Sequence, residues 1–173
     1  MLRQYRETSD VKAQILISHL NTVSMIFRTD FLREIGGWAA LRVWDDWELG
    51  LRALLHHPRM QWFTKRPFHQ IHVHPDSITG ADASSRFERQ LHVLRHVHQE
   101  LSVPADLQAL YYRHCILAGQ LLQEKNKSAA QQCEQQINQL FPQEKNLFGR
   151  FIKYYVSRGF RGAWKLAYYA TKY

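Results

Sequence analysis

The spacing of apolar residues divides the chain near residue 82. Before that point, helical spacing alternates with short apolar runs bounded by turn residues, and such runs are typical of strands. The predicted helices of this part span residues 11–20, 29–35 and 45–57, and the predicted strands span 22–28, 60–65 and 68–74. We therefore predict that residues 1–82 form an α/β unit with a partial mixed sheet.

Beyond residue 82 only helical spacing remains. The predicted helices span residues 84–101, 104–125, 127–140, 146–157 and 160–172. Pro104, the Asn126 turn and Gly159 separate them, because proline and glycine interrupt helices. We predict an all-α C-terminal extension at 83–145, followed by a basic, aromatic pair of amphipathic helices at 146–173.

Two adjacent carboxylates, Asp45 and Asp46, stand at the start of a predicted helix, between Trp44 and Trp47. A structural interpretation is that Asp45 caps the helix and Asp46 is a first-turn acid. A functional interpretation is that a carboxylate beside tryptophans is partly desolvated, which raises its pKa and suits a general base. An aromatic wall beside an acid also suits a sugar. Residue types alone leave both interpretations open.

Four segments follow one another in a specific order: 21–28, 31–38 with its Gly36-Gly37 pair, 45–52 and 72–77. This order resembles the second half of a family 2 glycosyltransferase domain of GT-A fold. In that family a strand leads to a Gly-Gly-aromatic turn, then to a helix with an acidic pair, then to a His-x-x-Ser pattern. The resemblance covers residues 10–82. Asp45 stands where Glu is commoner, and His72 replaces the usual basic residue.

The resemblance implies inverting transfer of a sugar from a nucleotide-sugar donor to a hydroxyl of a glycan or lipid-linked acceptor. Cell-surface polysaccharide or glycolipid synthesis is the setting that it suggests. Asp46 matches the general base of the family, and Asp45 is its neighbour in the acidic pair. Trp44 and Trp47 match the acceptor side. The residues implied near the donor diphosphate or its metal are His74, His72 and Ser77.

The donor-binding half of such an enzyme is not found in this sequence. Members of the family hold the nucleotide sugar and Mg²⁺ or Mn²⁺ with an N-terminal βαβ half and an Asp-x-Asp motif, and neither pattern occurs here. The spacing of Asp46 and Glu48 is similar, but it falls on the acceptor-side helix. We expect a glycosyltransferase fragment that binds no metal alone and needs a complementing N-terminal part for activity.

Histidines supply further candidates for metal or phosphate contact. His92 and His96 are four residues apart on a predicted helix, a spacing that can ligate zinc. A solvated helix face rich in Gln, Arg and His is the simpler explanation of that pair. His72 and His74 share one face of a predicted strand, which favours contact with phosphate or metal.

The chain has a formal net charge of +8, which points to anionic partners. Residues 146–173 interleave Lys and Arg with aromatic residues and contain no Asp or Glu. This composition suits an anionic membrane surface, since rings lie at headgroup level and cations reach phosphates. A helical hairpin packed on the domain is the structural alternative. Nucleic acid is not predicted as a partner, because no reading motif accompanies the charge.

The alternative function is therefore a non-catalytic basic helical module that binds an anionic membrane or a protein partner. Cys115 and Cys133 match no metal or redox spacing, which favours a reducing compartment. No apolar run approaches the roughly 20 residues that span a bilayer. We predict a cytoplasmic location, including the inner face of the membrane.

Overall fold

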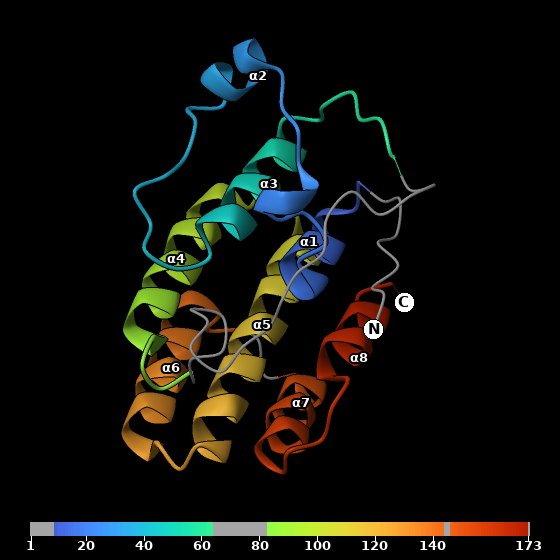
Figure 1. Cartoon of the computed structure of the whole chain (residues 1–173). Coiled ribbons are helices and arrows are strands. Elements are labelled where there is room, and N and C mark those ends of the chain that lie inside the picture. The colour runs from blue at the N-terminus through green and yellow to red at the C-terminus, as the bar shows by residue number, and fades with distance from the viewer. Residues whose placement is uncertain (1–8, 64–82, 144–145, 173) are drawn as a thin grey trace.

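The computed structural model describes residues 9–63, 83–143 and 146–172, and helices form nearly all of its regular structure (Figure 1). The α-helices are α1 (Val11–Ile17), α2 (Thr29–Glu34), α3 (Asp45–Leu55), α4 (Phe87–Glu100), α5 (Pro104–Gln123), α6 (Lys127–Leu140), α7 (Leu147–Ser157) and α8 (Ala163–Ala170). A short 3₁₀ helix, Thr22–Ser24, lies between α1 and α2.

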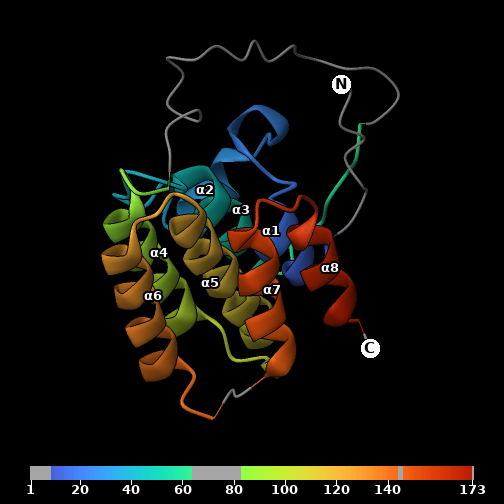
Figure 2. The same ribbon diagram turned by 90° about the horizontal axis from the view of Figure 1, so that it is seen from below.

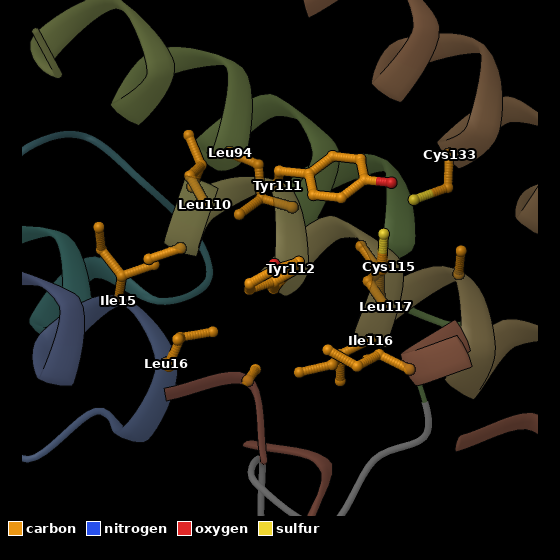
Figure 3. Packing of buried hydrophobic residues seen from close by; sticks show 14 of the residues in the cluster. Ile15, Leu16, Leu94, Leu110, Tyr111, Tyr112, Cys115, Ile116, Leu117 and Cys133 are labelled. Carbon is orange, nitrogen blue, oxygen red and sulfur yellow. The ribbon is translucent and has the colours of Figure 1, made fainter. Parts of the chain in front are cut away.

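Helix α5 is the centre of the molecule, with α4 and α6 on one side of it and α7 and α8 on the other (Figures 1 and 2). It begins with Pro104 at its first turn, where a missing N–H costs nothing. Every residue from Ala109 to Gly119 is buried, and a helix that is buried all round must be covered on every side. Figure 3 shows α5 side chains packed among those of α1, α4 and α6.

The C-terminal helices pack closely on the rest of the chain. At Gly119 of α5, an added Cβ would lie 2.7 Å from the backbone oxygen of Lys153 in α7, so the two helices meet backbone to backbone. The Tyr168 hydroxyl of α8 donates to Asp10 Oδ2, 3.0 Å away, at the start of α1. Side chains from α7 and α8 belong to the same apolar cluster as those of α1, α3 and α5.

The α/β prediction is wrong, because the residues that the structure describes contain no strand. Of the predicted strands, 22–28 has the 3₁₀ turn followed by non-helical backbone, and 60–63 has no regular structure. The segments 64–65 and 68–74 lie outside the described residues. Ile26 is 98% exposed, so the apolar run at 22–28 is not part of the core. A strand forms only where a neighbour pairs its N–H and C=O groups, and no such neighbour exists in the described chain.

The helix predictions are confirmed, with ends that differ by a few residues. Local signals account for this success. Asp10 Oδ1 accepts from Lys12 N at 2.9 Å, Asn126 Oδ1 from Ala129 N at 3.1 Å, and Asn146 Oδ1 from Phe148 N at 2.8 Å. Each is an N-cap that replaces a missing backbone partner in the first turn.

Candidate functional site

The acidic pair lies on the first turn of α3, where carboxylates complement the positive end of the helix dipole. Asp45 and Asp46 are both half-buried. Asp46 Oδ1 accepts from Trp47 N at 2.7 Å, and its Oδ2 accepts from Thr22 N at 3.5 Å. The carboxylate of Asp46 therefore joins the 3₁₀ helix to the start of α3. A carboxylate has about four lone-pair sites, so Asp46 keeps acceptor capacity beyond these two contacts.

Arg52 joins the glycine turn to the acidic helix. It donates to the carbonyl of Ile35 and, at 2.8 Å, to that of Gly37. Its Nε lies 2.7 Å from Glu48 Oε1, and this hydrogen bond is the main cause that raises the pKa of Arg52. Gly36 and Gly37 have φ values of 85° and 66°, which favour glycine. The glycine turn and the acidic helix, which are separate in the sequence, are thus joined through the side chain of Arg52.

The tryptophans surround a buried cation. The guanidinium carbon of Arg113, on α5, lies 4.4 Å from the ring centre of Trp44, 4.2 Å from that of Trp47 and 5.0 Å from that of Trp164. Trp47 is only 2% exposed, and its Nε1 donates to the Gln14 carbonyl at 2.8 Å. Trp44 is half-buried, so of the two predicted acceptor-side rings only Trp44 is partly open to solvent.

Arg113 is the site residue that the sequence analysis missed. Burial lowers the pKa of Arg113 to about 9, which still leaves it charged at neutral pH. It donates to the Ile15 carbonyl, and none of the ion pairs in the described ranges involves it. The electron-rich ring faces supply the compensation instead. The available signal was the Arg113–His114 pair in the middle of α5, flanked on both sides by apolar residues.

His92 and His96, the predicted histidine pair, contact different groups. His96 Nε2 lies 3.7 Å from Glu48 Oε1, whereas His92 lines a surface concavity with Arg42. Glu48 is engaged by Arg52, so the Asp46-x-Glu48 spacing does not make a metal site. Within residues 9–63, 83–143 and 146–172, no group of three or more His, Cys, Asp or Glu could hold a metal ion. His72, His74 and Ser77 lie outside these ranges.

Helices α7 and α8 expose a surface of apolar and basic side chains, called the α7–α8 surface below. Its large apolar side chains, which are 38% to 75% exposed, are Leu147, Phe151, Tyr154, Phe160, Leu166 and Tyr169. Its exposed cations are Arg150, Arg158, Arg161, Lys165 and Lys172. Phe148, Phe151, Tyr155 and Phe160 form a continuous row of rings with centroids 4.9 to 6.0 Å apart. Lys153, in contrast, is paired with Glu134 at 2.7 Å.

Comparison with models of protein families, with curated proteins and with solved structures finds no match for this chain. In the part of the chain that the structure describes, every helix is too short or too polar to cross a membrane.

Proposed function

We propose that this chain supplies the acceptor-side part of a nucleotide-sugar-dependent glycosyltransferase, with Asp46 as general base. The observation that carries the proposal is the joining of its sequence motifs around α3. Arg52 ties the Gly36-Gly37 turn to α3, and Asp46 ties residue 22 to the same helix.

In this proposal Asp46 takes the proton of an acceptor hydroxyl, and the resulting oxygen attacks the anomeric carbon of the donor. The bond to the nucleoside diphosphate breaks on the opposite side, so the anomeric configuration inverts. Asp45 adds negative charge beside the base, and Trp44 offers a half-exposed ring to the sugar. No described residue is assigned to the donor phosphates.

The test is sugar transfer by the purified chain, alone and together with a separately expressed nucleotide-sugar-binding polypeptide. We expect no transfer by the chain alone and transfer by the pair. Asp46→Asn should abolish transfer while donor binding is retained. Asp30→Asn is the matched control, since Asp30 is an exposed carboxylate of α2 that pairs with Arg28. Transfer by Asp46→Asn at the unmodified rate would overturn the role of Asp46.

The second candidate function is binding to an anionic membrane surface at the inner face of a cytoplasmic membrane. The α7–α8 surface favours it, because exposed rings beside exposed cations suit the headgroup region. The two functions are compatible: Trp164 of α8 contacts Arg113, which contacts the Trp44 and Trp47 rings beside Asp46.

Co-sedimentation of the full chain with vesicles tests the membrane proposal. We expect binding to vesicles that contain phosphatidylserine, weaker binding to phosphatidylcholine alone, and release by salt. Arg161→Gln/Lys165→Gln should weaken binding, because both side chains are exposed on the α7–α8 surface. The membrane proposal would be wrong if the double variant bound these vesicles as well as the unmodified chain, or if the unmodified chain did not bind them at low salt.

A further inference from the structure

The loop before α3 and the first turns of α4 line an open surface concavity of about 270 Å³, called the basic concavity below. Its polar lining is Arg42 from the loop and Glu88, Arg89 and His92 from α4, above the apolar side chains of Leu41 and Val93. Arg89 and His92 are three residues apart, so they share one face of the helix. Arg42 reaches the same space from another element.

We propose that the basic concavity binds a phosphoryl group. Two guanidinium groups from different elements can clasp the oxygens of one anion, and the planar fork of arginine matches phosphate geometry. His92 adds a further donor. The backbone N–H groups at the start of α4 carry no side-chain cap, and the helix dipole there favours negative charge. With Glu88 included and His92 neutral, the lining has a net charge of plus one.

The size of the basic concavity limits what it holds. Pockets for drug-sized ligands have volumes of roughly 300–1,000 Å³, so a space of about 270 Å³ suits one phosphate or diphosphate group. Arg42, Glu88, Arg89 and His92 are exposed, so the remainder of the ligand extends into solvent. The shared chemistry is a phosphate ester or diphosphate, carried either by a soluble molecule or by a lipid headgroup.

The basic concavity is separate from the α7–α8 surface. Helix α4 lies on the opposite side of α5 from α7 and α8 in both views (Figures 1 and 2). An anion held by Arg42 and Arg89 would therefore not contact the cations of α7 and α8. Phosphoryl binding by the basic concavity therefore requires neither transferase activity nor membrane binding by the α7–α8 surface.

Calorimetric titration of the full chain with pyrophosphate tests the proposal. We expect saturable binding, and at least a roughly ten-fold rise in Kd for Arg42→Gln/Arg89→Gln, because each lost contact is a charge-assisted hydrogen bond. Arg161→Gln/Lys165→Gln is the matched control, since it removes the same charge from the opposite side and should leave Kd unchanged. Glu88→Gln should tighten binding. All five substituted side chains are exposed, and circular dichroism verifies that each variant is folded.

Vesicles of phosphatidylcholine with phosphatidic acid show whether the phosphoryl group belongs to a lipid headgroup or to a soluble molecule. These vesicles are tested in the Arg161→Gln/Lys165→Gln background, which weakens binding through the α7–α8 surface. A lipid headgroup is the ligand if adding Arg42→Gln/Arg89→Gln to that background abolishes vesicle binding and pyrophosphate competes with the vesicles. A soluble ligand is indicated if pyrophosphate binds and adding Arg42→Gln/Arg89→Gln to that background leaves vesicle binding unchanged. The proposal is overturned if pyrophosphate does not bind at millimolar concentration, or if both double variants bind it equally.

Discussion

The guanidinium carbon of Arg113 lies 4.2 Å from the centre of the Trp47 ring, in the interior of the molecule. Trp44 and Trp164 complete the enclosure, so one side chain of α5 holds together α3 and the segment that contains α8. A buried charge normally requires an opposite charge. Here the faces of three indole rings take that role.

Replacing Arg113 with alanine should lower the free energy of unfolding by about 3 kcal/mol. Desolvated cation–π contacts contribute about 2 kcal/mol or more, and the hydrogen bond to the Ile15 carbonyl adds to this. Urea denaturation measures the change. Arg113→Met keeps most of the volume but removes the charge, and it should also destabilise. A methionine variant as stable as the unmodified chain would show that the ring contacts merely offset the burial of the charge.

The ion pair between Glu48 and Arg52 should stabilise the start of the acidic helix. The Glu48 side chain is 2% exposed and that of Arg52 is 16% exposed, so solvent screens the pair weakly. Glu48→Gln should cost about 2 kcal/mol, because Arg52 is left without its counter-charge. Glu88→Gln, at an exposed position of α4, is the control and should change stability little. Equal effects of the two substitutions on the urea midpoint would contradict this prediction.

His114 should make the chain less stable in acid. Burial lowers the pKa of His114 from 6.5 to about 4; its Nδ1 donates to the Leu110 carbonyl at 2.9 Å, and its Nε2 accepts from the Gln136 amide at 3.2 Å. Between these pH values the unfolded chain binds a proton that the folded chain does not. The free energy of unfolding therefore falls as pH falls through this window, by about 3 kcal/mol in total.

Urea denaturation at pH 7 and at pH 4, on the unmodified chain and on His114→Gln, isolates this contribution. Other groups titrate in both chains, so the difference between the two pH dependences belongs to residue 114. Glutamine does not titrate, and the variant should lose less stability on acidification. Identical pH dependences would rule out His114 as the source.

Gly119→Ala should destabilise the chain although alanine is the better helix former. The added Cβ would lie 2.7 Å from the Lys153 oxygen and 2.7 Å from Val156 Cβ, which is closer than real Cβ contacts. Moving α7 away from α5 to relieve this overlap costs roughly 1–3 kcal/mol, against a gain of about 1 kcal/mol from helix propensity. Ser128→Ala, on the exposed side of α6, is the control. A raised melting temperature for Gly119→Ala would contradict the close packing of α5 and α7.

The sequence predicted the positions of the acidic pair and of the glycine turn correctly, but not what surrounds them. Asp45 and Asp46 lie in the first turn of a helix as expected, but the N-cap is Trp44 and not Asp45. Trp47 was predicted on the acceptor side, and the structure places it in the core. Which face of a helix is buried near its end depends on its neighbours, and these come from residues far away in the chain.

What the sequence determined by itself is the series of helices, since a helix is closed by hydrogen bonds and caps within a few residues. Asp10, Asn126 and Asn146 cap their helices wherever the helices then pack. Only the tertiary structure decided that 22–28 is not a strand and that Arg113 lies among three tryptophans. Both outcomes depend on partners distant in the sequence, and a local pattern of residues carries no information about such partners.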